Sequence, residues 1–306
     1  MNILFCDNPF DGKTVDPDFQ GEYTAAQTAE FNTHLFSFET LTGDRDAAAA
    51  IRKVKPADIM QPMIYRGWML KPSQYSMLYN ALLAKNFTLI NTPAQYQHCH
   101  YLPDSYVSIE GRTPRSSWLP ISDGGIDFNQ VFSILTSFGT SPLVIKDYVK
   151  SQKHYWDTAC FIPSAADKAQ AKSVIETFLS LQGNDLNEGL VIREYVELND
   201  LALHSVSGMP LKEEYRLFFL NNRLFAFYNY WDAVEYPAAD MPPFDDFIAC
   251  AKEIPSNFFS MDIAKTKTGE WTIIELGDGQ VAGIPETVQP DLFYNALAYR
   301  IRAAAS

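Results

Sequence analysis

Cysteine is scarce in this sequence of 306 residues, and its four cysteines lie far apart. Disulfide frameworks and structural zinc sites need closely spaced cysteines, such as C-x-x-C pairs, and the chain has none. The neighbours His98, Cys99 and His100 do not converge easily on one ion, so we expect a loop without a metal role there. The four cysteines are Cys6, Cys99, Cys160 and Cys250.

Long apolar runs are also missing. No stretch approaches the roughly 18 apolar residues that identify a membrane-spanning helix. Residues 1–7 contain no Lys or Arg and only a short apolar run, so the sequence predicts no signal peptide. We therefore expect a cytoplasmic protein that does not bind membranes.

Positive charge is the third deficit. The chain has 24 Lys and Arg residues but 37 Asp and Glu residues, which gives a formal charge of −13. This balance repels nucleic-acid backbones and anionic membranes at long range, so we expect no nucleic-acid partner. It does not exclude a nucleotide, since a few cations in a cleft create a local positive field. The sequence G-x-x-x-x-G-K-[ST] is absent as well, which excludes a P-loop.

Strands and helices alternate over the first hundred or so residues. This order predicts an α/β domain with a mostly parallel sheet, which we assign to residues 1–120. Pro62 is expected at a sheet edge or a strand end, and Ser73 is expected to cap a helix. The expected strands are Asn2–Cys6, 34–38, 59–65 and 88–91, and the expected helices are 22–31, 47–54 and 73–86.

Residues 103–123 are rich in Pro, Ser, Thr and Gly, and we interpret them as a connection between domains. The remainder, 121–306, contains strand pairs joined by turn-like segments with helices between them, which predicts an α+β domain. Its expected strands are 143–146, 190–196, 214–220, 224–230, 258–264 and 271–276, and its expected helices are 128–139, 165–181 and 243–251.

Two carboxylates stand on the last predicted hairpin. If its strands pair through a turn near Thr268 and Gly269, Asp262 and Glu275 come close together. Adjacent carboxylates repel each other unless a cation lies between them, and Mg²⁺ takes such hard oxygen ligands. The alternative is a pair of solvated acids at strand ends.

Two cations stand on apolar strands. Arg216 lies in a strongly apolar strand, and a buried arginine needs either an acidic partner such as Glu214 or a bound phosphate. Lys146 ends another apolar strand, where its ammonium group can reach a phosphate oxygen. The alternative for Lys146 is an ordinary surface lysine.

A third segment suggests a nucleotide-binding bend. An apolar strand carrying Arg193 runs into Glu194, Tyr195 and Val196, and Glu197 follows. The main chain of such a bend can bind the edge of an adenine ring, and a following acid can bind ribose hydroxyls.

In this order, the segments resemble the ATP-grasp superfamily over roughly residues 120–300. The strand-end lysine matches Lys146, the Glu-x-Arg strand matches Glu214 and Arg216, and the metal hairpin matches Asp262 and Glu275. The chain is most similar to a bacterial and viral clade marked by two arginines and a lysine, which we assign to Arg193, Arg216 and Lys146. The resemblance implies an α/β pre-ATP-grasp domain that binds substrate, followed by an α+β ATP-grasp domain whose two subdomains clamp ATP.

The resemblance also implies an activity, namely an ADP-forming carboxylate–amine ligase that uses ATP and Mg²⁺. Lys146 and Arg216 would act on the phosphates, the bend from Arg193 to Glu197 would hold the nucleoside together with Glu214, and a loop at 150–154 would close over the phosphates. The product would be an amide or peptide bond formed through an acylphosphate. Its carboxylate and amine would come from small molecules or peptides, and the sequence is compatible with a homodimer.

One position departs from the family pattern. Many ATP-grasp enzymes carry Glu-x-Asn at the metal site, whereas this chain has Glu275, Leu276 and Gly277. Asp278 is expected to supply the missing oxygen. Two other interpretations stay open: an ATP-binding module without turnover, and an ATP-dependent modifier of a polypeptide.

The first domain offers one candidate for the substrate. Arg66 follows a predicted strand, and ligands of open α/β sheets lie at the carboxyl ends of the strands. Its guanidinium is expected either to bind a substrate carboxylate or to pair with a surface acid.

Overall fold

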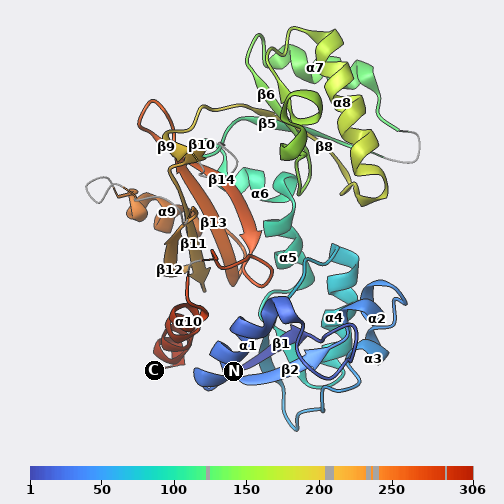
Figure 1. Ribbon diagram of the computed structural model, residues 1–306, viewed down its shortest axis with the longest axis vertical. Helices are drawn as coiled ribbons and strands as arrows, with labels where there is room; N and C mark the ends of the chain where they lie inside the picture. The colour runs from blue at the N-terminus through green and yellow to red at the C-terminus, as the bar shows by residue number, and fades with distance from the viewer. Residues whose placement is uncertain (122–124, 204–209, 232–235, 237–240, 287, 306) are drawn as a thin grey trace.

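The N-terminal domain is built on four parallel strands in the order β2-β1-β3-β4. The structure is a computed structural model that describes residues 1–121, 125–203, 210–231, 236, 241–286 and 288–305 (Figure 1). The prediction of a parallel sheet is confirmed. The strands are β1 (Asn2–Cys6), β2 (Asn32–Phe36), β3 (Gln61–Arg66) and β4 (Phe87–Leu89), and the helices around them are α1 (Gln20–Thr28), α2 (Phe38–Thr42), α3 (Ala47–Ala50), α4 (Pro72–Leu83) and α5 (Pro93–His100).

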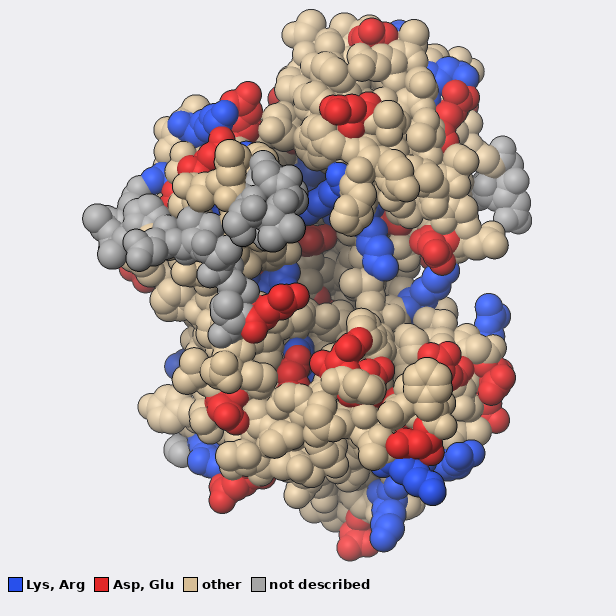
Figure 2. Space-filling model, in the orientation of Figure 1, with Lys and Arg blue, Asp and Glu red and all other residues tan. Residues whose placement is uncertain are grey.

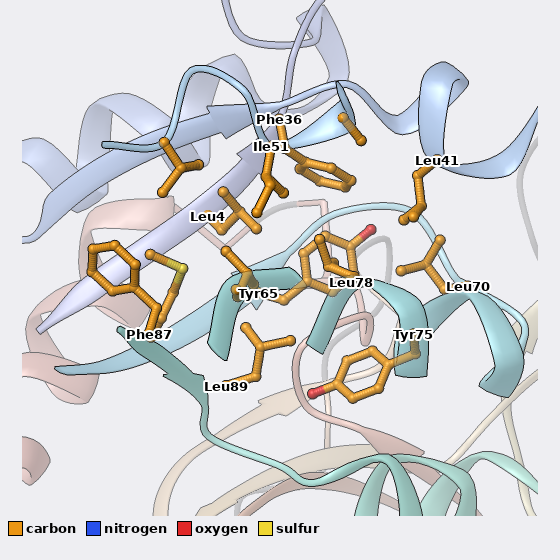
Figure 3. Close-up of a cluster of buried hydrophobic side chains, with 14 of the residues drawn as sticks. Leu4, Phe36, Leu41, Ile51, Tyr65, Leu70, Tyr75, Leu78, Phe87 and Leu89 are labelled. Atoms are coloured by element: carbon orange, nitrogen blue, oxygen red, sulfur yellow. The ribbon is translucent and has the colours of Figure 1, made fainter. Parts of the chain in front are cut away.

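Apolar side chains from these strands and from α4 form the core of this domain (Figure 3). Leu4, Tyr65 and Leu78 are fully buried in it. The apolar positions of α4 repeat at helical spacing, which places Tyr75, Leu78 and Leu82 on the buried face.

One local prediction in this domain is confirmed and another is wrong. β3 lies between β1 and β4, and Pro62 stands at the start of this interior strand, which is the second of the two expected places, a strand end. It is tolerated because the ladder between β1 and β3 begins one residue later, at Met63. The helix α4 begins at Pro72, whose fixed φ suits the first helical turn, so Ser73 is not the N-cap.

A second sheet, antiparallel, has the order β5-β8-β6-β7 and forms the upper subdomain of Figure 1. One face packs through Leu143, Ile145 and Ile192 against two helices, whereas the alternate residues point away from them. Its elements are β5 (Ser116–Pro120), β6 (Leu143–Asp147), β7 (Phe161–Ile162) and β8 (Gly189–Glu194), with α7 (Phe128–Ser137) and α8 (Lys168–Gln182).

A third sheet, also antiparallel, has the order β12-β11-β13-β14 and lies between the upper subdomain and the N-terminal domain. The turn between its first two strands places Asn221 and Asn222 at φ of 49° and 57°, as a tight hairpin requires. Its elements are β11 (Glu214–Leu220), β12 (Arg223–Asn229), β13 (Phe258–Lys265) and β14 (Trp271–Asp278), with α9 (Phe244–Ala251) on one face and a small sheet of β9 (Asp200–Leu203) and β10 (Pro210–Lys212) nearby.

Four α-helices among the described residues were not predicted from the sequence, namely α2, α5, α6 (Leu102–Ile109) and α10 (Pro290–Ala305). The segment 103–123, expected to be a connection, contains most of α6 and the strand β5. The helix α10 packs against α1 and β12 and joins the end of the chain to its beginning. Because β5 pairs with β8, residues just before 120 already belong to the second sheet. The division into 1–120 and 121–306 stays a prediction.

None of the helices in the described residues combines the length and the apolar content that crossing a membrane requires.

Candidate functional site

Three charged residues form one row across the third sheet. Arg216 on β11 lies directly opposite Asp262 on β13, and Asp262 lies directly opposite Glu275 on β14. Directly opposed residues project from the same face of a sheet. The hairpin therefore brings the two carboxylates together, as its sequence predicted.

Arg216 and Asp262 form a bidentate ion pair. The Arg216 Nε donates to Asp262 Oδ1 at 2.8 Å, and Nη2 donates to Oδ2 at 2.8 Å. Burial alone would lower the pKa of Arg216, but the Asp262 carboxylate outweighs it and raises that pKa. The Arg216 guanidinium also lies over the ring of Tyr230, 5.0 Å from its centroid. The orientation of Arg216 is thus set by three contacts with neighbouring groups, the third being Gly283 O at 2.8 Å from Nη1.

The second carboxylate of the row reaches the other sheet. Lys146 Nζ on β6 lies 3.2 Å from Glu275 Oε1. Burial opposes ionisation of Glu275, yet the charges of Lys146 and Lys153 hold the pKa of Glu275 below its ordinary value. The Glu275 side chain is 45% exposed, so it faces a space that a ligand can enter.

Lys153 has no separate role in the sequence pattern, but the structure places it near the row. It lies in the loop after β6, at the start of a short 3₁₀ helix (Lys153–Tyr155), and is exposed. Its charge acts on Glu214 and Glu275. Burial raises the pKa of Glu214 to about 7, with the charge of Lys153 opposing the shift. The loop at 150–154 therefore brings a cation toward the row.

Arg193 on β8 shares a face with Lys146. In the ladder between β6 and β8, Val144 pairs with Arg193 and Lys146 pairs with Val191, which places both cations on the face away from α7 and α8. Arg193 is only 8% exposed. Its Nη2 donates to Thr113 Oγ1 at 2.8 Å and to Ile273 O at 3.2 Å.

Burial lowers the pKa of Arg193 to about 10, and the charge of Glu275 opposes this shift. The guanidinium has hydroxyl and carbonyl partners but no carboxylate within ion-pair distance among the described residues. A buried cation with no paired carboxylate suits an anionic ligand.

Beyond β8, the predicted bend has main-chain groups that are available for hydrogen bonding. The N–H of Tyr195 donates to Pro142 O at 2.9 Å, and Glu197 O accepts from Lys267 N at 2.9 Å. Between them, the N–H and C=O of Val196 make no hydrogen bond within the described part of the chain. Free main-chain groups at this position are what binding of an adenine edge requires.

Aromatic rings support this bend. Trp156 and Phe161 stack with centroids 5.3 Å apart, and Tyr195 packs edge-on against both. Two ion pairs hold its acids, Arg115 with Glu194 at 3.4 Å and Lys267 with Glu197 at 3.2 Å.

Asp278 does not join the row. It pairs with Phe259, a residue of the opposite face of the sheet, and is fully buried. It accepts hydrogen bonds from Asn91 Nδ2 at 2.6 Å and from the N and Nε2 of Gln280. Burial raises the pKa of Asp278 to about 7. Strand alternation thus separates it from Asp262 and Glu275.

Gly277 shares the face of Glu275, and a larger residue there would press on a neighbouring side chain. A Cβ atom there would lie 2.8 Å from Ser260 Oγ. Among the described residues, no group of three His, Cys, Asp or Glu side chains is arranged to hold a metal. The site therefore offers two carboxylates to a cation.

Arg66 lies away from solvent and is already paired. It is 1% exposed, and its Nε and Nη2 donate to the two carboxylate oxygens of Glu22 at 2.9 Å each. Its Nη1 donates to Gly279 O and Ala282 O. The acid that Arg66 binds is thus one of the protein's own, as in the second of the two expectations, but Glu22 is only 14% exposed and is not a surface acid.

His100, expected in a loop, ends the helix α5, which packs against β14. Burial lowers the pKa of His100 to about 4, and the charges of Glu275 and Lys146 also act on it. The missed signal was a helix start: Thr92 and Gln95 form a reciprocal capping box around Pro93.

In the space-filling view, the upper subdomain stands apart from the rest of the molecule across a hollow (Figure 2). Lys and Arg side chains line the walls of this hollow, although the molecule as a whole is acidic. The row on the third sheet and the cations of the second sheet meet through the contact between Lys146 and Glu275.

Comparison with known proteins agrees with this arrangement. Residues 137–297 match the family model of an ATP-grasp domain, specifically family 3 of the clade named for its two arginines and one lysine. No curated protein matches the chain.

Solved structures resemble the chain over its whole length. D-cycloserine synthetase DcsG is 13% identical, with a TM-score of 0.55 over 98% of this chain and 99% of that one. ATP-grasp ligase PsnB, complexed with a minimal precursor, is 11% identical, with a TM-score of 0.56 over 100% and 99%. A RimK domain protein from Sphaerobacter thermophilus is 10% identical, with a TM-score of 0.60 over 98% of both chains. At such identities the likeness shows the fold.

Proposed function

The chain belongs to the ATP-grasp domains, in family 3 of the two-arginine, one-lysine clade, and on that premise we propose that it uses ATP and Mg²⁺ to join a carboxylate to an amine. The observation that carries the proposal is the row of Arg216, Asp262 and Glu275 facing Lys146 from the other sheet. Phosphoryl transfer needs positioned cations and a metal site far more than it needs a nucleophilic side chain.

The triphosphate would lie between the second and third sheets. Lys146 and Arg193, on one face of the second sheet, would neutralise phosphate charge. The free main-chain groups of Val196 would bind the adenine edge, with Glu194 and Tyr195 shaping the bend. Glu197 would bind the ribose. Glu214, on the same strand as Arg216, would border the phosphates.

The donor set fits one Mg²⁺ ion. Asp262 and Glu275 would hold it, and Mg²⁺ is commonly held by one or two carboxylates together with substrate phosphates. Gly277 cannot ligate, and Asp278 is buried on the opposite face. The ion would neutralise charge on the phosphates. Cations already beside Asp262 and Glu275 favour the ionised carboxylates that a metal requires.

The reaction would proceed in two transfers. The substrate carboxylate attacks the γ-phosphorus of ATP, the bond to the β–γ bridging oxygen breaks, and an acylphosphate and ADP form. The amine then attacks the acyl carbon, phosphate leaves, and the amine loses a proton. Arg216 would stabilise charge on the phosphoryl group during both transfers. The loop at 150–154 would exclude water that would otherwise hydrolyse the acylphosphate.

We propose that the acceptor is a small molecule or a peptide. Two of the solved relatives are a D-cycloserine synthetase and a ligase complexed with a peptide precursor, and these span both kinds. A polypeptide acceptor would show as ATP consumption that requires a macromolecular fraction and not free amino acids.

A second candidate function is ATP binding without turnover. Gly277 favours it, because the side-chain ligand common at that position is missing and a replacement would meet Ser260. If the protein only binds ATP, Mg-ATP would raise its thermal stability, but no ADP would be released with any acceptor.

The test is ADP release from Mg-ATP across a panel of amino acids and peptides, with Glu275→Gln as the inactive control. A ligase releases ADP only with particular substrate pairs, and the control abolishes this release. Equal release by wild type and control with every substrate would show that the metal assignment is wrong. Stabilisation by Mg-ATP without any release would favour the binding module.

A further inference from the structure

The segment from Asp278 to Gly283 begins at the last residue of β14 and is held by the N-terminal domain. Asn91 Nδ2 donates to the Asp278 carboxylate, the N–H of Tyr65 donates to Gln280 Oε1 at 3.0 Å, and Gln280 Nε2 donates to Tyr75 OH at 2.8 Å. These bonds join residues that are 187 to 215 positions apart in the sequence. They fix the segment to the carboxyl ends of β3 and β4.

Arg66 makes the largest share of this attachment. Its Nη1 lies 2.7 Å from Gly279 O and 2.8 Å from Ala282 O, so a single nitrogen bridges two carbonyls of the segment. The guanidinium cannot swing away, because its other side is bound to Glu22 through two hydrogen bonds. Glu22 is fixed in turn by the hydroxyl of Tyr294 on α10, at 2.7 Å.

The other end of the segment touches the candidate site. Gly283 O accepts from Arg216 Nη1 at 2.8 Å. Arg66 therefore holds Ala282 and Arg216 holds Gly283, on consecutive residues of the chain. The Ala282 carbonyl lies in the peptide unit that ends at the Gly283 Cα, and the Gly283 carbonyl lies in the next unit, so holding Ala282 anchors the start of the residue whose carbonyl binds Arg216.

This contact matters because Asp262 is shared. In the proposed function Asp262 also faces Mg²⁺, so the ion pair with Asp262 alone does not fix Arg216 against the phosphates. The Gly283 carbonyl is a contact that no ligand of the proposed reaction uses. It sets the direction of Nη1 whichever group Asp262 binds.

We propose that Arg66 is a positioning residue: by holding the segment 278–283, it fixes the Gly283 carbonyl that orients Arg216. The claim that Arg66 affects phosphoryl transfer rests on the proposed function. The claim that Arg66 holds the segment in place does not depend on that function. Arg66 touches neither nucleotide nor substrate in this role, and it makes the geometry of Arg216 depend on the N-terminal domain.

The test compares Arg66→Gln and Arg66→Lys with Leu78→Ala, a matched control. Leu78 is fully buried in the core of the same domain, so its truncation also destabilises that domain without removing a hydrogen bond to the segment. The first readout is amide hydrogen exchange of residues 279–284. We expect about ten-fold faster exchange in Arg66→Gln than in Leu78→Ala, because only the former removes the two bonds to the segment.

The second readout is calorimetric binding of Mg-ADP and of a non-hydrolysable Mg-ATP analogue. Arg216 faces the terminal phosphoryl group in the proposed function. Arg66→Gln should therefore lower the affinity for the Mg-ATP analogue about ten-fold and leave the affinity for Mg-ADP unchanged. Arg66→Lys keeps one cation near Glu22, so its hydrogen exchange and its affinity for the analogue should lie between those of Arg66→Gln and the wild type.

Equal exchange of residues 279–284 in Arg66→Gln and Leu78→Ala would overturn the proposal, since Arg66 would then act only on global stability. If Arg66→Gln lowered the affinities for Mg-ADP and for the Mg-ATP analogue equally, the link between Arg66 and Arg216 would be overturned. If the wild type binds neither nucleotide, the proposed function fails, and the exchange comparison alone decides whether Arg66 positions the segment.

Discussion

Arg216 and Asp262 face each other across two neighbouring strands and are joined by two parallel hydrogen bonds of 2.8 Å. A second pair of a cation and a carboxylate lies beside them, where Lys146 of the second sheet lies 3.2 Å from Glu275. Each carboxylate of the proposed metal site is therefore already beside a cation. The cations favour the ionised carboxylates: against the effect of burial, Lys146 and Lys153 hold the pKa of Glu275 below its ordinary value. Burial raises the pKa of Asp262, and the Arg216 charge opposes this shift. The cations are themselves placed where a triphosphate needs them.

Replacing Asp262 with Asn should separate its two roles. The change removes the charge that pairs with Arg216 and a ligand for Mg²⁺, so we expect ADP formation to fall about 10²-fold or more. Stability should fall by about 1–3 kcal/mol, because Arg216 keeps a buried charge with a weaker partner. Substrate-dependent ADP release and urea unfolding measure these effects.

The matched control is Asp200→Asn, which breaks an exposed ion pair with Lys212. We expect a change in stability within about 0.5 kcal/mol and unchanged ADP release. Equal losses of activity in the two variants would remove Asp262 from the site.

Lys146→Met should weaken nucleotide binding while preserving the fold. Methionine fills similar space without the charge, and a lost charge-assisted hydrogen bond to phosphate corresponds to about a ten-fold to hundred-fold loss of affinity. Calorimetric titration with a Mg-ATP analogue checks this. Lys172→Met, at a surface pair with Glu176, should bind as the wild type does. An unchanged affinity in Lys146→Met would show that Lys146 serves only as the partner of Glu275.

Gly277→Asn tests the departure from the family pattern. The new side chain meets Ser260 Oγ, so we expect about 1–2 kcal/mol of destabilisation from overpacking. Adding Ser260→Ala should relieve much of that loss and leave an amide oxygen beside Glu275. Tighter Mg²⁺ binding by the double variant than by Ser260→Ala alone, measured by calorimetry with ADP present, is the expected outcome. Identical binding would show that position 277 lies outside reach of the metal.

Stability should depend on pH through two carboxyl groups whose pKa values burial raises to about 7, namely Glu214 and Asp278. In the unfolded chain their pKa values are near 4.5 and 3.8. Between those values and pH 7 the folded state binds more protons than the unfolded state. Each group therefore favours the folded state at low pH and loses that contribution as pH rises toward 7.

Glu214→Gln removes one of these titrations. The difference in unfolding free energy between Glu214→Gln and wild type should thus grow in favour of the variant from about pH 5 to about pH 7.5. Urea unfolding at several pH values measures it, and other titrating groups cancel in the difference. A difference that stays constant across this range would show that Glu214 is ionised throughout.

Local patterns were sufficient for much of the fold. Apolar runs bounded by turn residues predicted most strands, and the spacing between Asp262 and Glu275 predicted that the two would face each other, as the ladder shows. Lys146 and Arg216 could be singled out because a charge in an apolar strand is unusual.

The helices α2, α5, α6 and α10 were missed. The helix α5 lacks a periodic apolar pattern. By contrast, α10 carries Phe293, Leu297 and Ile301 at helical spacing and could have been predicted.

Long-range pairing was beyond the sequence. Arg66 could bind either a substrate or a protein acid, and only the structure shows Glu22 beside it, 44 residues away. Asp278 follows Gly277 closely, but a one-residue step along a strand turns a side chain to the opposite face. Its partners Asn91 and Gln280 approach from that face.

The sequence by itself determined most of the strands, which charges stand in apolar surroundings, and the order that marks an ATP-grasp chain, because these depend on neighbours along the chain. Only the tertiary structure decided which cation meets which carboxylate, that Arg66 holds the segment 278–283, and that two carboxylates rather than three face the hollow. Those outcomes depend on strand register and on contacts between distant residues, and packing of the whole molecule sets both.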